Sequence, residues 1–221
     1  MISADKIFAT VKEQGIIPLF YHEDVDVCKR VIDALYKAGV RIVEYTNRGD
    51  KALENFKTLI ELRSQHWPEL LLSVGTIKNQ QQAAAFIEAK ADFIICPGVV
   101  PVVAKECAKS NIVWVPGCMT PTEIILAEEH GAKLVKLFPG NLLEPAFVSA
   151  VKELFPGIMF MPTGGVEVDE ENMRTWFKAG VVAVGLGSKV ISKEVLANKE
   201  YSKIEMLAAK ALSIVKQIKS N

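Results

Sequence analysis

One lysine stands in an apolar stretch that offers no partner for its charge. Lys136 lies within the run 134–139 (LVKLFP), which has the composition of a buried strand. Burial disfavours the charged form of an amine and lowers its pKa, and a free amine attacks carbonyl carbons. The run therefore predicts a lysine that can act as a nucleophile toward carbonyl carbons. The structural alternative is a lysine that extends from a strand end into solvent.

A carboxylate and a guanidinium follow each other in the segment 41–48. Alternation along an extended strand places Ile42, Glu44 and Thr46 on one face. If that face points inward, Glu44 is a carboxylate in the interior of the fold. Arg48 offers a planar set of donors that matches a carboxylate. The alternative is that Glu44 lies at the rim and is paired with an arginine.

Glycine-bearing turns follow the last two strand candidates, in the segments 162–165 (PTGG) and 185–188 (GLGS). Backbone N–H groups in such turns can close around phosphate oxygens, although glycines also simply make tight turns. Together the two turns favour a phosphate site. The same alternation rule predicts that Val74 and Thr76 point inward at the end of the third strand, and Cys118 follows the fifth strand near the expected mouth.

Short β-branched runs alternate with longer helical patterns along the whole chain. The eight strand candidates are 16–21, 41–46, 71–76, 93–97, 112–116, 133–138, 158–162 and 181–185. Further helices are expected at 3–14, before the first strand, and at about 199–218, after the last one. This pattern predicts a (β/α)8 TIM barrel with an extra N-terminal helix and a C-terminal helix, formed by residues 1–221 as a single domain. No GxGxxG follows the first strand, which argues against a dinucleotide-binding fold.

Composition excludes several other classes of protein. The 221 residues contain 26 basic and 26 acidic side chains without a Lys/Arg block, so no nucleic-acid partner is expected. No apolar run approaches the ~20 residues of a membrane helix and no signal peptide is evident, so we expect a cytoplasmic protein that does not enter a membrane. Four cysteines without CxxC spacing are expected to be free thiols, and three scattered histidines predict no metal site.

Seven short motifs, in order and at the expected strand ends, resemble the class I aldolases that cleave 2-keto-3-deoxy-6-phosphogluconate (KDPG) and 4-hydroxy-2-oxoglutarate (KHG). The resemblance runs from about Gly15 to Ser188. Its motifs are 43–48 (VEYTNR), 75–76 (GT), 96–98 (CPG), 115–117 (VPG), 135–139 (VKLFP), 162–165 (PTGG) and 187–188 (GS).

The resemblance implies a role for each matching residue. Lys136 is expected to form the Schiff base, with Glu44 as the general acid and base. The substrate-binding residues are expected to be Arg48, Thr76, Pro97, Phe138 and Thr163. The phosphate-binding residues are expected to be Gly164, Gly165, Gly187 and Ser188. The resemblance also implies a homotrimer that acts on a small keto acid or sugar phosphate and needs no cofactor and no metal.

Some positions depart from the pattern of this family. Residues 118–120 (CMT) stand where other members often carry Ile-Ser-Thr, and Lys189 follows the loop serine where a neutral residue is common. Thr163 resembles the gluconate branch. Three alternatives stay open: an aldolase for the galactonate-derived substrate, a sugar-phosphate decarboxylase or epimerase without a Schiff base, and a barrel that binds keto acids without catalysis.

Overall fold

The computed structural model describes residues 2–220, which fold into alternating strands and helices with every strand pair parallel. The strands are β1 Ile16–Phe20, β2 Ile42–Thr46, β3 Leu71–Gly75, β4 Phe93–Ile95, β5 Val113–Val115, β6 Gly117–Cys118, β7 Leu134–Leu137, β8 Met159–Pro162 and β9 Val184–Leu186. The helices are α1 Ala4–Gln14, α2 Val25–Lys37, α3 Ala52–His66, α4 Gln80–Glu88, α5 Pro101–Lys109, α6 Pro121–Glu129, α7 Gly140–Val151, the 3-10 turn η1 Lys152–Leu154, α8 Glu170–Ala179, α9 Lys193–Ala197 and α10 Tyr201–Ser220. Each of the eight predicted strands is present, and the predicted α/β class with a parallel sheet is confirmed.

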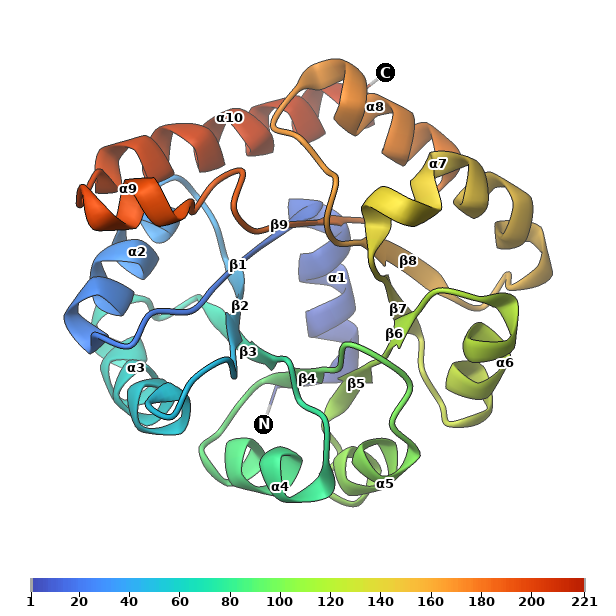
Figure 1. The fold of residues 1–221 in the computed structure, drawn as a ribbon, viewed down its shortest axis with the longest axis horizontal. Coiled ribbons are helices and arrows are strands. Elements are labelled where there is room, and N and C mark those ends of the chain that lie inside the picture. Colours follow the sequence, from blue (N-terminus) through green and yellow to red (C-terminus); the bar gives the residue numbers. More distant parts are fainter. Residues whose placement is uncertain (1, 221) are drawn as a thin grey trace.

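The strands curl around a common axis with helices outside them, but they form two hydrogen-bonded ladders and not one continuous sheet (Figure 1). One ladder has the order β5-β4-β3-β2-β1-β9 and the other β6-β7-β8. Pro116 divides the predicted fifth strand into β5 and β6, because proline has no N–H to donate to a ladder. Between β8 and β9 there is an isolated bridge from Thr163 to Gly185, and Val182 donates its N–H to the carbonyl oxygen of Phe160 at 3.0 Å.

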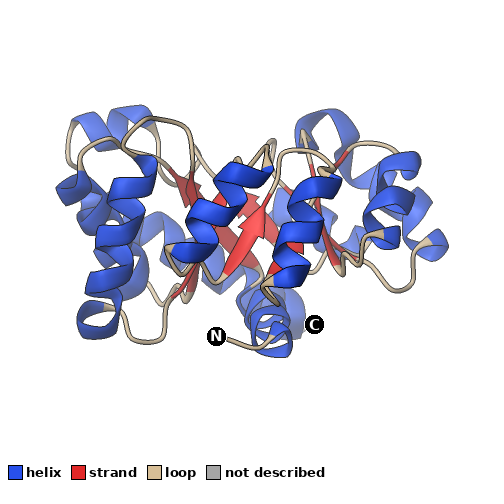
Figure 2. Cartoon of the chain, turned by 90° about the horizontal axis from the view of Figure 1, so that it is seen from below, coloured by secondary structure: helices blue, strands red, loops and turns tan. Residues whose placement is uncertain are grey.

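Helix α1 closes the end of the strand layer at which the strands begin. Ile7 and Val11 of α1 are buried in a cluster with residues from the N-terminal parts of the strands, including Ile17, Ile42 and Leu71. Figure 1 shows α1 behind the centre of the ring of strands, and Figure 2 shows the N-terminal segment and the helix after it at one end of the strands. Only the opposite end, where the strands finish, is therefore left for a site.

Local sequence signals set the helix boundaries near this core. Ser3 caps α1 by accepting the Lys6 N–H at 3.3 Å, and Gly15 ends the helix with φ 67°, which suits glycine. Thr120 and Glu123 form a capping box at the start of α6. These signals set both ends of α1 and the start of α6.

The prediction that Val74 points inward is wrong. Val74 is buried in the cluster between the strands and the outer helices, and Ser73 faces inward instead. Ser73 is the register partner of Glu44, and neighbouring residues across a parallel pair point to the same side of the sheet. The prediction assumed that Thr76 continues the extended strand and that Val74, two residues before it, shares its face. Thr76 instead has φ 63°, so the alternation of faces stops at Gly75.

Candidate active site

The centre of the candidate site is a buried pair between Lys136 on β7 and Glu44 on β2. Lys136 is 5% exposed and Glu44 is 1% exposed, and Nζ of the lysine lies 3.2 Å from each carboxylate oxygen. The two residues are 92 positions apart in the sequence, and the curled sheet brings them together. Burying two charges costs free energy that their attraction only partly offsets, so such a pair is weak evidence for stability and favours a functional role.

The space for the Glu44 carboxylate comes from Gly75 at the end of β3. A Cβ atom built on Gly75 would overlap the carboxylate of Glu44. The next residue, Thr76, is half-buried and has a left-handed backbone, which is rare for a β-branched residue and is found at functional sites. Sequence reasoning assigned Thr76 to the site but gave no role to Gly75.

Two further predicted residues lie beside the lysine. The Phe138 ring centroid is 5.7 Å from Nζ of Lys136, within the range of a cation–π contact. Pro97 is half-buried, and its carbonyl oxygen lies where a side chain on Gly117 would be. Because Gly117 is the register partner of Lys136, Pro97 approaches the strand next to the lysine.

Thr163 follows β8 and carries a hydroxyl group without a partner. Its residue is 6% exposed, and Oγ1 is the one buried side-chain polar atom in residues 2–220 that makes no hydrogen bond. A buried hydroxyl without a partner costs free energy, so a native structure usually has a reason for one. A substrate group that reaches this hydroxyl would supply that reason.

The two glycine-bearing loops lie next to each other, because the Thr163–Gly185 bridge joins the strands that lead into them. Gly164 and Gly165 have φ 91° and 75°, and Gly140 donates its N–H to the carbonyl oxygen of Thr163 at 2.8 Å. Gly187 is half-buried and Ser188 is exposed. Backbone N–H groups of adjacent glycine-bearing loops are of the kind that can bind anions.

An ion pair that sequence reasoning did not predict connects these same two loops. Nζ of Lys189, next to Ser188, lies 2.7 Å from Oε1 of Glu167, two residues after Gly165. Both side chains are about half exposed. Nothing in a single sequence pairs residues from two separate loops, so only the three-dimensional structure reveals this contact.

Arg48 makes no hydrogen bond or ion pair with Lys136 or Glu44. It is exposed, and within residues 2–220 its side chain makes no hydrogen bond and no ion pair. The alternative in which Glu44 is a rim carboxylate paired with an arginine is therefore wrong, because Glu44 is buried and pairs with Lys136. Among the described residues, no group of three or more His, Cys, Asp or Glu side chains is placed to hold a metal ion.

Cys118 does not line the mouth of the site. It is buried in the cluster between strands and outer helices, and burial raises the pKa of its thiol to about 12. A thiol with so high a pKa carries almost no thiolate at neutral pH, which removes it as a candidate nucleophile.

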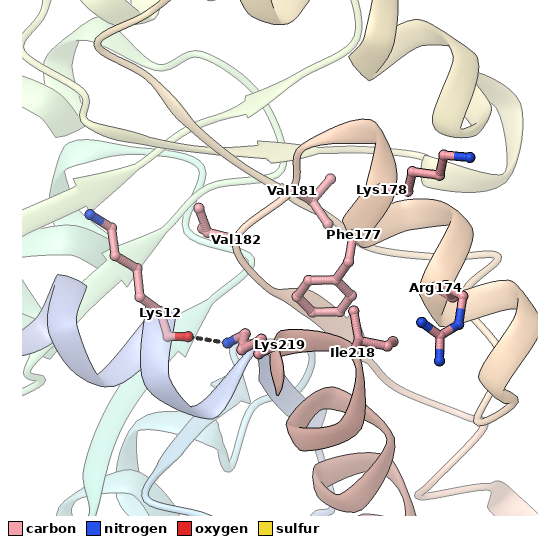
Figure 3. Close-up of a pocket in the computed structure, with 8 residues that line it drawn as sticks. All are labelled: Lys12, Arg174, Phe177, Lys178, Val181, Val182, Ile218 and Lys219. Carbon is pink, nitrogen blue, oxygen red and sulfur yellow. Dashed lines mark hydrogen bonds between the residues drawn. The ribbon is translucent and has the colours of Figure 1, made fainter. Parts of the chain in front are cut away.

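A separate cavity of about 530 Å³ opens between α1, α8 and the end of α10 (Figure 3). Phe177 lies at its centre, and the Lys219 ammonium donates to the carbonyl oxygen of Lys12. None of the predicted site residues lines this cavity. It lies beside α1, at the end of the strands away from Lys136.

The fold and site define a parallel α/β protein with an interior lysine–carboxylate pair and two adjacent glycine-bearing loops. Comparison with known proteins specifies the family. The sequence profile of the KDPG and KHG aldolase family matches residues 7–207. The chain is 30% identical over 210 residues to the 2-dehydro-3-deoxy-phosphogluconate aldolase of Treponema pallidum, with 95% of this chain and 97% of the relative covered. It is 28% identical over 212 residues to the KHG/KDPG aldolase of Escherichia coli K12, with 95% of each covered.

A solved structure agrees with this relationship. The KDPG aldolase of Legionella pneumophila, with pyruvate captured as a covalent carbinolamine intermediate, superposes with a TM-score of 0.83 at 26% identity and covers 91% of this chain and 95% of its own. The chain therefore belongs to the KDPG and KHG aldolase family and is an aldolase, a carbon–carbon lyase. No helix within residues 2–220 is both long and apolar enough to span a membrane.

Proposed function

We propose that this aldolase cleaves KDPG to pyruvate and glyceraldehyde 3-phosphate through a Schiff base on Lys136, and that it also accepts KHG. The observation that carries the proposal is the buried Lys136–Glu44 pair, with Nζ 3.2 Å from both carboxylate oxygens. Relatives named for these substrates support the choice of substrate.

The first half of the reaction prepares an electron sink. Glu44 accepts a proton from the Lys136 ammonium, and the free amine attacks the C2 ketone to give a carbinolamine. Glu44 returns its proton to the departing hydroxyl group, so loss of water leaves a protonated imine beside an ionised Glu44. The positive imine nitrogen can then accept the electrons of the C3–C4 bond. The relative with a trapped carbinolamine supports this covalent route.

The second half breaks the bond and returns the enzyme. Glu44 takes the proton of the C4 hydroxyl, the C3–C4 bond breaks, and its electrons form an enamine while the aldehyde departs. The same carboxyl then delivers a proton to C3, and water hydrolyses the protonated imine to free pyruvate and regenerate the Lys136 ammonium. One group can act as base and then as acid if it stays within hydrogen-bond reach, directly or through one water.

The remaining predicted residues would hold the substrate. Arg48 and Thr76 would bind the keto-acid carboxylate, which suits the uncommitted guanidinium of Arg48. Phe138 and Pro97 would form walls beside the reacting carbon, and the free hydroxyl of Thr163 would bind an oxygen of the substrate.

The phosphate would lie between the two loops that carry Gly164, Gly165, Gly187 and Ser188. The bridge from Thr163 to Gly185 supports this placement, since it holds the loops side by side. Their backbone N–H groups would share the oxygens of one phosphate.

Reduction with borohydride in the presence of pyruvate tests the covalent step. We expect a stable adduct on Lys136, located by peptide mass spectrometry, and no adduct in Lys136→Met. Lys133→Met, which removes an exposed lysine three residues away, serves as the matched control and should label normally. A wild-type protein that forms no adduct would overturn the mechanism and favour a decarboxylase- or epimerase-type enzyme or a non-catalytic keto-acid-binding protein.

Cleavage rates on the gluconate- and galactonate-derived substrates separate the two branches of the family. We expect the gluconate-derived compound to be preferred, because the relatives at 28–30% identity carry that name. A preference for the galactonate-derived compound would assign the chain to the alternative aldolase.

The larger architecture completes the proposal. We propose that the two ladders act as one closed (β/α)8 barrel in a single domain of residues 1–221, supported by the contacts at Pro116 and between β8 and β9. We also propose a cytoplasmic homotrimer. Exposed apolar side chains support an interface between copies; among them are Val102, Met119, Ile125 and Leu142. Sedimentation equilibrium would show three chains per particle.

A further inference from the structure

We propose that Lys189 is a specificity-determining residue that exchanges its partner during the reaction: Glu167 in the empty enzyme, the substrate phosphate in the complex. The inference rests on the proposed function, because it requires a phosphate between the two loops. It adds two residues that the phosphate site does not otherwise include.

The position of the ion pair is the first argument. Glu167 belongs to the loop with Gly164 and Gly165, and Lys189 belongs to the loop with Gly187 and Ser188. The Lys189–Glu167 contact at 2.7 Å thus connects the same two loops that a phosphate would connect. A lysine carries its ammonium on four flexible methylene groups, so it can turn from one partner to another without backbone movement.

Exposure is the second argument. The side chains of Lys189 and Glu167 are 50% and 46% exposed, so their attraction is weakened by water and either partner can be replaced. A phosphate monoester carries between one and two negative charges at neutral pH and offers three acceptor oxygens. It is therefore a stronger partner for an ammonium than a single half-exposed carboxylate.

The charge of Glu167 supplies the third argument. Its backbone N–H donates to the Asn172 side chain at 3.0 Å, which ties this residue to the first turn of α8. A carboxylate held close to the loop would repel a phosphate, and Lys189 neutralises it. The nearby acids Asp169 and Glu170 already have partners, the first as the cap of α8 and the second in an ion pair with Arg174. Lys189 pairs directly with Glu167, so it compensates the charge of this carboxylate.

This arrangement makes opposite predictions for the two single variants. Glu167→Gln releases the ammonium and should lower the KM for KDPG by about twofold to fivefold. Lys189→Met removes the cation and leaves Glu167 uncompensated, and should raise that KM by about threefold to tenfold. The double variant loses the cation without the repulsion, so its KM should lie between those of the wild type and Lys189→Met.

The reference reaction is exchange of the C3 protons of pyruvate with deuterated water, followed by NMR. Exchange needs the imine and the proton acceptor but involves no phosphate. Each variant is scored by the ratio of its KDPG kcat/KM to its pyruvate exchange rate, and inorganic phosphate is tested as an inhibitor of KDPG cleavage. Lys203→Met and Glu200→Gln are matched controls, because this pair at the start of α10 is similarly exposed, at 48% and 40%, and lies outside these loops.

Each outcome decides the inference. A rise in KM for Lys189→Met with a fall for Glu167→Gln, and parallel changes in phosphate inhibition, supports partner exchange. Equal losses in both single variants, in kcat/KM and in pyruvate exchange alike, would mean that the pair only clamps the loops and would overturn it. Ser188→Ala distinguishes failure of the phosphate site from failure of partner exchange. If the ratio of KDPG kcat/KM to pyruvate exchange is unchanged in Ser188→Ala, the phosphate site itself is misplaced. If that ratio falls in Ser188→Ala but not in Lys189→Met, only the partner exchange is refuted.

Discussion

At the scale of single residues, the site depends on a missing side chain as much as on those present. Lys136 and Glu44 can meet only because Gly75 leaves room for the carboxylate on the neighbouring strand. The hydroxyl of Thr163, just after β8, is buried and has no hydrogen-bond partner. Small residues thus set the geometry within which the two ionisable groups work.

Gly75→Ala should impair catalysis without unfolding the protein. The added methyl group would overlap the Glu44 carboxylate and push it away from Nζ of Lys136, and a displacement of about 1 Å at a reacting group can cost on the order of a hundredfold in rate. We expect kcat for KDPG cleavage to fall by about tenfold to a hundredfold, measured by coupling pyruvate release to a dehydrogenase.

Gly157→Ala is the control for this change. A Cβ atom on Gly157 would make only an ordinary contact, 3.7 Å from a carboxylate oxygen of Glu128. Equal activity in the two variants would show that Gly75 does not position Glu44.

At the scale of the elements, α1 is part of the core although it precedes the first strand. Ile7 is 1% exposed and Val11 is fully buried, in the cluster formed with the inward-facing strand residues. The helix therefore covers the apolar side chains at the N-terminal ends of the strands, which would otherwise be exposed to water.

Ile7→Ala should destabilise the protein by about 2–5 kcal/mol, the usual range for truncating a buried isoleucine. Urea denaturation followed by circular dichroism measures the change. Met206→Ala, at a residue that is 61% exposed on α10, should change the free energy of unfolding by less than about 0.5 kcal/mol. Similar losses of unfolding free energy in both variants would mean that burial of Ile7 on α1 does not stabilise the core.

The sequence predicted these elements well where one physical rule decided the structure. Period-two alternation placed Glu44 inward and apolar runs located every strand, because burial on both faces leaves an unmistakable pattern. The same rule failed at Val74, where the left-handed backbone of Thr76 interrupts the alternation. Alternation also does not show that Pro116 divides the fifth strand. That division depends on whether a neighbouring strand has a carbonyl group facing the position where proline lacks an N–H.

Contacts between loops that are far apart in the sequence could not be predicted, for a different reason. Lys136 was recognised from its apolar neighbours, and its pairing with Glu44 required only that both point inward. The Lys189–Glu167 contact has no such signal, since both side chains are polar, exposed and located in turns. Their pairing follows from the way two ladders approach each other.

At the scale of the whole molecule, the four cysteines are all buried and unpaired. Burial raises the pKa of Cys28 to about 11 and those of Cys96, Cys107 and Cys118 to about 12. The native protein at pH 8 should therefore react slowly with a thiol reagent such as DTNB, and the urea-unfolded protein should show four rapid equivalents.

The same thiols give stability a pH dependence of known sign. Because their pKa values are higher in the folded state than in the unfolded state, the folded protein binds more protons between about pH 9 and pH 11–12. Their stabilising contribution is complete below about pH 9 and is lost as the pH rises through that window, by at most about 1.4 kcal/mol per pH unit for each thiol. Rapid native labelling at pH 8 would contradict both expectations.

The position of α1 also constrains the order of events in the proposed reaction. Because α1 covers one end of the strand layer, reactants and products must enter and leave at the other end, and the amine of Lys136 is buried below that opening. The fragment attached to that amine is the inner one, so the aldehyde has to depart before pyruvate can be released. In the synthetic direction pyruvate must bind first and form its enamine before the aldehyde arrives, so the covalent chemistry and the single open end of the strand layer together make the reaction ordered.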